Sequence, residues 1–136
     1  MNSVVHFEIA ADEPQRAKKF YSLFGWDFVE TSLEMGNYIL CHTTKTDKEG
    51  MPQRKGAING GIMTKDKITR QTILTIGVTD LKNTLKKVKK SGGKVISETV
   101  TIPGVGDYCR IEDTEGNVVS LMEPTMEYKE KAKKLK

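Results

Sequence analysis

The fold of this chain is decided by residues 4–28, which read V-V-H-F-E-I-A-A-D-E-P-Q-R-A-K-K-F-Y-S-L-F-G-W-D-F. Side chains alternate between two faces over residues 4–10, a pattern typical of a half-buried strand. Val5, Phe7 and Ile9 form the apolar face of this expected strand. His6 and Glu8 lie on its other face, where they are available for chemistry.

A helix is expected directly after that strand. Asp12 is a good N-cap residue, and Pro14 is well tolerated in a first helical turn. Gly25 has the freedom of backbone conformation that commonly ends a helix. A second strand is expected from Trp26 to Thr31.

The same pattern returns in the second half of the chain, which indicates an internal duplication. At an offset of 68 residues, Asp12 falls on Asp80, Gly25 on Gly93, Glu30 on Glu98 and Thr31 on Thr99. Further strands are expected at residues 37–43, 57–64, 73–78, 94–99, 107–112 and 118–123, with a bend at 102–106. The sequence therefore predicts two βαβββ modules, about 3–64 and 73–123, in one α+β domain spanning residues 1–126.

Charge and composition point to a soluble protein. The net charge is +4, but residues 127–136 hold five lysines against two glutamates, so most of the excess lies in a basic C-terminal tail. The body is close to neutral, and no aromatic residues interleave with the lysines of residues 82–90, so we expect no nucleic-acid partner. Met1 to Glu13 resembles neither a secretory signal nor a membrane span, so a cytoplasmic location without membrane contact is expected.

Cys41 and Cys109 lie in strand-like segments without a second cysteine nearby. This spacing fits neither a zinc ribbon nor a redox pair. We expect two buried free thiols, because free cysteine behaves as a small apolar residue.

Two glycines and two polar segments complete the pattern. Gly60 and Gly61 lie within an expected strand, where glycine allows another group to approach the backbone closely. Residues 45–56 are expected to form an exposed loop, and residues 65–72 to connect the modules.

The chain resembles the vicinal oxygen chelate superfamily of glyoxalases, bleomycin-resistance proteins and dioxygenases. The resemblance covers about residues 3–123 and rests on H-F-E-I-x-A-D at 6–12, K-F-Y-x-x-F-G-W at 19–26, I-P-G-V-G at 102–106 and D-x-E-G-N-V at 113–118. It is closest to the uncharacterised glyoxalase-related, lactoylglutathione lyase-like branch. The resemblance implies paired βαβββ modules forming a cup-shaped mixed sheet.

That resemblance also implies a metal site with four ligand positions, one from the first and one from the last strand of each module. His6 matches the first position, but the second falls in the Ile58–Met63 strand, which offers no carboxylate. The third and fourth fall on Ile73 and Ser120. These residues do not supply the three or more ligands a catalytic divalent ion needs, so no metal or other cofactor is expected. An improvised site combining His6 and Glu8 with Asn59, Tyr108 or Glu112 is a weaker alternative.

We expect instead a pocket for a small polar organic molecule. His6 is the candidate catalytic base and Glu8 its partner. The candidate ligand-binding residues, placed by strand period and by the resemblance, are Asn59, Thr75, Tyr108, Arg110 and Ser120. Arg110 has the geometry to bind a carboxylate or phosphate. An ion pair between Arg110 and Glu8 is an open alternative.

Three functions remain open at this point, and whether the chain is an enzyme is one of the questions. The first is a metal-independent lyase or isomerase related to lactoylglutathione lyase, the second a drug- or toxicant-binding protein, and the third a metal-dependent lyase or dioxygenase. The resemblance also implies a homodimer. The aromatic residues are expected in the core or in subunit contacts, namely Phe7, Phe20, Tyr21, Phe24, Trp26 and Tyr38.

Overall fold

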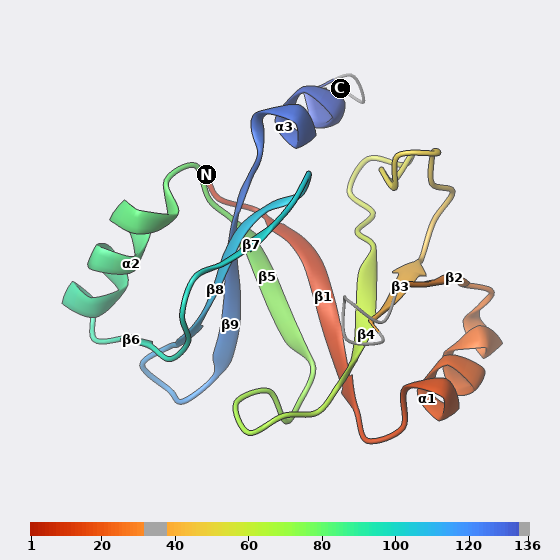
Figure 1. Ribbon diagram of the computed structural model, residues 1–136, viewed down its shortest axis with the longest axis horizontal. Coiled ribbons are helices and arrows are strands. Elements are labelled where there is room, and N and C mark those ends of the chain that lie inside the picture. The colour runs from red at the N-terminus through yellow and green to blue at the C-terminus, as the bar shows by residue number, and fades with distance from the viewer. Residues whose placement is uncertain (32–37, 134–136) are drawn as a thin grey trace. The chain divides into compact units, whose positions relative to one another are not determined.

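The computed structural model describes residues 1–31 and 38–133, in two compact units. We call His6–Ile73 the N-terminal module, and Met1–Val5 with Leu74–Lys136 the C-terminal module. Figure 1 shows the chain in its order of elements, from red at the N-terminus to blue at the C-terminus. Residue 37, where the strand expected over residues 37–43 begins, lies outside the described residues.

The N-terminal module follows the predicted strand, helix and three strands. Its elements are β1 (Val4–Ala11), α1 (Pro14–Tyr21), a 3-10 turn η1 (Ser22–Phe24), β2 (Asp27–Glu30), β3 (Ile39–His42) and β4 (Gly60–Thr64). Their order in the sheet is β2-β3-β4-β1, with β1 and β4 parallel and the other neighbours antiparallel.

The C-terminal module repeats this topology. Its elements are β5 (Ile73–Gly77), α2 (Leu81–Lys90), β6 (Lys94–Val95), β7 (Val100–Ile102), β8 (Gly106–Glu112), β9 (Val118–Pro124) and α3 (Met126–Lys133). β5 and β9 are parallel, as β1 and β4 are in the other half, and β6 and β7 both pair with β8. The predicted α+β fold of paired βαβββ modules is confirmed.

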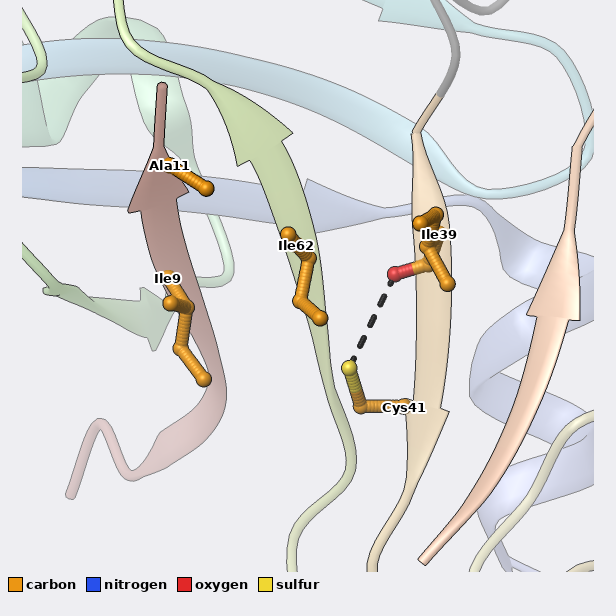
Figure 2. Close-up of a cluster of buried hydrophobic side chains, with 5 residues drawn as sticks. All are labelled: Ile9, Ala11, Ile39, Cys41 and Ile62. Carbon is orange, nitrogen blue, oxygen red and sulfur yellow. Dashed lines mark hydrogen bonds between the residues drawn. The ribbon is translucent and has the colours of Figure 1, made fainter. Parts of the chain in front are cut away.

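Each module has its own core of buried apolar residues. In the N-terminal module these all lie in strands and are Ile9, Ala11, Ile39, Cys41 and Ile62, drawn in Figure 2. In the C-terminal module they are Cys109, Ile111 and Leu121 of the strands, Val78 directly after β5 and Leu81 of α2. Both cysteines are free and fully buried, as predicted. Burial raises the pKa of the Cys41 thiol to about 12, since an apolar site disfavours the thiolate.

The two helices begin differently, although the repeat predicted the same cap for both. Asp80 caps α2 as expected, because its carboxylate accepts a hydrogen bond from the Asn83 backbone at 2.9 Å. The prediction for Asp12 was wrong. The N-cap of α1 is Glu13, and Asp12 instead pairs with Lys65, whose Nζ lies 3.0 Å from its carboxylate. Gly25, with a φ of 75°, ends the helical segment after η1, as predicted.

The strand predicted for residues 94–99 is interrupted. Only Lys94–Val95 and then Val100–Ile102 pair with β8, so part of the predicted bend is strand. The cause is the side chain of Ser97, whose hydroxyl accepts the Arg110 backbone N–H at 2.8 Å in place of a carbonyl. Between the pairs Val95–Ile111 and Val100–Tyr108, four residues on one side face only two residues of β8. The extra two residues form a bulge.

The basic C-terminal segment contains a helix that the sequence did not reveal. α3 starts after Thr125, whose hydroxyl accepts the Tyr128 backbone N–H at 3.2 Å. The Thr125 backbone N–H in turn donates to the Val105 carbonyl at 2.9 Å, which ties the helix start to the bend before β8. No helix in the described parts of the chain combines the length and apolar character needed to cross a membrane.

Candidate functional site

His6 lies on the face of β1 opposite the core, as its place in the alternating pattern predicted. Its Nε2 is 2.8 Å from the hydroxyl oxygen of Tyr38, which precedes β3. The two ring planes are 16° apart, and both side chains are half-buried. The hydrogen bond fixes the imidazole in one orientation and joins two groups that can exchange protons.

Tyr38 reaches His6 because the strand between their backbones carries glycine at the crossing point. A Cβ at Gly61 would overlap the ring and hydroxyl of Tyr38. In the same way, a Cβ at Gly60 would overlap the ring of Phe7 on the core face. The predicted close approach to these glycines is confirmed, and the approaching groups are two aromatic rings of the same module.

Glu8 shares a face of β1 with His6 and lies directly across from Gly61 in the parallel ladder. Its side chain is half-buried, as is that of His6. The N-terminal module therefore gathers a carboxylate, an imidazole and a phenol around one glycine. These are groups suited to proton transfer.

Asn59 has its polar atoms committed to the adjacent loop. Its Oδ1 accepts the Thr43 backbone N–H at 3.0 Å, and its Nδ2 donates to the Thr46 hydroxyl at 3.0 Å. The side chain is buried, with 8% of its surface exposed. These bonds favour a role in holding the loop that joins β3 and β4.

Three predicted ligand-binding residues form one row across the C-terminal module. Thr75 of β5 is paired with Ser120 of β9, and Ser120 is paired with Arg110 of β8. All three are buried. The Thr75 hydroxyl lacks a hydrogen-bond partner among the described residues, an arrangement that costs free energy unless a further group satisfies it.

Arg110 is held by its own strand neighbour. Its guanidinium carbon lies 5.4 Å from the centre of the Tyr108 ring, a cation–π distance. Tyr108 and Arg110 are two residues apart on β8, so they share a face. The ring supports the planar guanidinium, which presents several N–H donors suited to a carboxylate or phosphate.

The metal-ligand positions that the resemblance implies are poorly matched in this chain. After His6, they fall on a strand with Gly60, Gly61 and Asn59, then on Ile73 and Ser120. Ile73 is a buried apolar side chain, and Asn59 is committed to its loop. Within residues 1–31 and 38–133, no three His, Cys, Asp or Glu side chains gather closely enough to hold a metal ion. This donor set does not fit a catalytic divalent ion.

The sequence and the strand order match a known family. The model of the glyoxalase/bleomycin resistance protein/dioxygenase superfamily matches residues 3–121. The chain belongs to this superfamily. A glyoxylase-like domain-containing protein from Didymella fabae is 32% identical over 114 residues, which cover 81% of this chain and 84% of the relative.

Solved structures are also similar to the chain. Methylmalonyl-CoA epimerase from Mycobacterium tuberculosis has 18% identity and a TM-score of 0.63, over 93% of this chain and 91% of that one. A catechol 2,3-dioxygenase has 16% identity and a TM-score of 0.56, over 90% of this chain and 40% of the dioxygenase. At these identities the likeness shows the fold.

Tyr38 is the functional candidate that the sequence did not single out. It was expected in the core or in a subunit contact, yet it makes the side-chain hydrogen bond to His6. The signal available in the sequence was Gly61, because a glycine in a central strand leaves room for a large side chain from a neighbouring strand. Nothing in the spacing of 32 residues identified which side chain would fill that room.

Proposed function

We propose that this superfamily member binds a small polar organic molecule and acts on it as a metal-independent lyase or isomerase. The observation that carries the proposal is the hydrogen bond of 2.8 Å between His6 and Tyr38 on the non-core face of β1. A lyase or isomerase of this kind needs a base that takes a proton from a substrate carbon and an acid that returns one.

His6 is the proposed base. Histidine changes its charge near neutral pH, so it accepts and releases protons under ordinary conditions. Tyr38 orients the ring through Nε2 and is able to pass a proton to or from it. Glu8, on the same face of the strand, is the proposed partner of His6. In an isomerase His6 takes a proton from one substrate atom and a proton is returned to another. In a lyase the electron pair left by the proton forms a double bond, while the leaving group departs from the adjacent carbon with its bonding electrons and takes up a proton.

Ligand binding is assigned to the row in the C-terminal module. The planar guanidinium of Arg110 suits a carboxylate or phosphate, and the hydroxyls of Thr75 and Ser120 suit neutral oxygens. The missing partner of the Thr75 hydroxyl supports this assignment, because a buried polar atom is normally satisfied.

Independence from metal is part of the proposal and rests on the donor set. Ile73 and Ser120 stand where the resemblance implies metal ligands. The test is elemental analysis of protein purified without chelator and without a nickel column. Less than a tenth of an equivalent of any transition metal is expected, and a stoichiometric ion would contradict the proposal.

The catalytic role is tested by substitution after a ligand has been found in a thermal-shift screen of small carboxylates and carbonyl compounds. His6→Ala should reduce kcat by about 10²–10⁴-fold, the usual contribution of a general base. His42→Ala is the matched control, because His42 is the other histidine of the chain. Turnover that survives His6→Ala would remove the proposed base. If the wild type binds the ligand without turning it over, and His6→Ala binds it with the same affinity, a binding protein is favoured.

The roles proposed for Arg110 and Tyr38 predict different kinetic effects. Arg110→Met keeps the volume over Tyr108 and removes the charge, so it should raise KM about 10-fold or more with a smaller change in kcat. Tyr38→Phe removes one hydroxyl and should lower kcat with little effect on KM. The opposite pattern in these two variants would refute the assignment of roles.

A further inference from the structure

Five lysines cover the solvent side of α2, a helix of ten residues without an acidic residue. They are Lys82, Lys86, Lys87, Lys89 and Lys90, and we call them the α2 lysines. All five are exposed, whereas Leu81, Leu85 and Val88 pack in the core of the C-terminal module. Figure 1 shows α2 at the outer edge of that module. The exposed face of the helix is therefore positively charged along its whole length, about 15 Å.

The charge of the α2 lysines is not neutralised by ion pairs. Among the residues that the structure describes, no ion pair involves any of the five. In α1, by contrast, Lys18 lies 3.3 Å from an oxygen of Glu30. Arg16 of the same helix pairs with Glu13. The positive field of α2 is therefore directed at groups outside the chain.

Helix stability accounts for only part of this set of lysines. Lys87, Lys89 and Lys90 lie in the last turn, where the helix dipole favours cations. Lys82 lies in the first turn, where the same dipole disfavours them. Lys86 is four residues from both Lys82 and Lys90, and like charges at that spacing destabilise a helix. A binding partner explains the whole set better than the fold does.

We propose that the α2 lysines bind the surface of an anionic lipid bilayer. Clusters of four to eight basic residues on an amphipathic helix are suited to acidic lipid headgroups. α2 lies flat on the headgroups, while Leu81, Leu85 and Val88 stay in the core of the module. The contact is made by charge alone, and no part of the chain enters the hydrocarbon.

The composition of this face favours lipid over protein or nucleic acid. α2, which is described in full, exposes one further residue, Asn83, so its surface has no apolar centre. Protein interfaces bury such a centre and are depleted in lysine. The helix also contains no arginine and no aromatic residue, the side chains that most often bind and stack nucleic acids. Lysine is a compact point charge, which suits mobile headgroups without a fixed geometry.

The proposal revises one expectation from the sequence. No membrane contact was expected, because residues 1–13 contain no apolar span. Attraction by charge needs no such span. The revised expectation is a reversible attachment of the folded protein at the membrane surface.

The test is co-sedimentation of the full chain with vesicles at 1 mM lipid. Each lysine contributes about 5-fold to the partition coefficient, so five give on the order of 10³ M⁻¹. About half or more of the protein should therefore sediment with phosphatidylcholine vesicles containing 30 mol% phosphatidylserine in 0.1 M NaCl. It should not sediment with phosphatidylcholine alone, nor with either vesicle in 0.5 M NaCl, because salt screens the attraction. The triple variant Lys82→Gln, Lys86→Gln, Lys89→Gln should lower the partition coefficient about 10²-fold.

Two matched variants isolate the contribution of α2. Lys45→Gln, Lys48→Gln, Lys55→Gln removes the same charge from exposed positions of the N-terminal module and should retain binding within about 3-fold. Replacing the three α2 positions by arginine keeps the charge and should also retain binding. Circular dichroism checks that each variant is folded.

Three outcomes would each overturn the proposal. The first is a wild type that does not sediment with the phosphatidylserine vesicles. The second is an equal effect of the two glutamine triples, which would show that only net charge matters. The third is a single-stranded DNA of 20 nucleotides that releases the protein from the vesicles at micromolar concentration, which would favour a nucleic-acid partner.

Discussion

The close approach of Tyr38 to Gly61 gives the sharpest test of the site geometry. In the variant Gly61→Ala, the new methyl group would occupy the space of the Tyr38 ring. Gly61 lies in β4 with a φ outside the left-handed region, so alanine adopts its backbone without strain. The whole effect should therefore come from the displaced ring.

The expected cost has three parts. Overpacking costs about 1–3 kcal/mol, and loss of the hydrogen bond to His6 costs about 1 kcal/mol. Replacing glycine by alanine in a compatible conformation returns about 0.4–1 kcal/mol through the unfolded state. The free energy of unfolding should fall by about 1–3.6 kcal/mol, which urea denaturation monitored by circular dichroism resolves well.

A double-mutant cycle isolates the cause. In the Tyr38→Ala background the obstacle is gone, so Gly61→Ala should be neutral or slightly stabilising. Gly60→Ala is the companion variant, because its methyl group meets Phe7 in the core instead. It should also destabilise the protein, and this loss should persist in the Tyr38→Ala background. If Gly61→Ala costs as much without Tyr38 as with it, the reasoning is refuted.

Further predictions concern caps, buried hydroxyls and thiols. Asp80→Ala should lower the free energy of unfolding in urea by about 1 kcal/mol, because it removes the cap of α2. Asp12→Ala should leave the urea midpoint nearly unchanged. Equal losses of stability in the two variants would contradict the assignment of the caps. Thr69→Val should stabilise the protein by about 1 kcal/mol, since the Thr69 hydroxyl is fully buried and lacks a hydrogen-bond partner among the described residues; a loss of stability would show that a partner exists. Burial raises the pKa of the Cys41 thiol from 9.0 to about 12. The stability that the protonated thiol contributes is therefore complete below pH 9. It decreases between pH 9 and 12, by at most about 1.4 kcal/mol per pH unit. Denaturation of wild type and Cys41→Ala over this range measures the difference, and parallel pH profiles would refute it.

Local patterns were sufficient to predict most of the fold. Alternation over residues 4–10 placed His6 on the non-core face, and the repeat at 68 residues placed the second module. Asp80 and Gly25 acted as expected because capping and left-handed termination depend on a few neighbouring residues.

The errors arose where a distant group competed for a local partner. Lys65, 53 residues away, takes the carboxylate of Asp12 from the helix it was expected to cap. The Ser97 hydroxyl replaces a backbone acceptor and splits a strand. α3 was missed because its start depends on Thr125 and on the Val105 carbonyl, which no periodic pattern reveals.

The ladders also show how two halves of the same topology differ in their side chains. In the N-terminal module, one row of paired positions holds Glu8, Gly61 and Leu40. The equivalent row of the C-terminal module holds Thr75, Ser120 and Arg110. In the first row the charged side chain is the carboxylate of Glu8 on β1, and Gly61 leaves room for Tyr38, which lies outside the row. In the second row the charged side chain is the guanidinium of Arg110 on β8, beside the hydroxyls of Ser120 and Thr75. The same backbone geometry therefore carries a carboxylate and a glycine in one half and a guanidinium with two hydroxyls in the other.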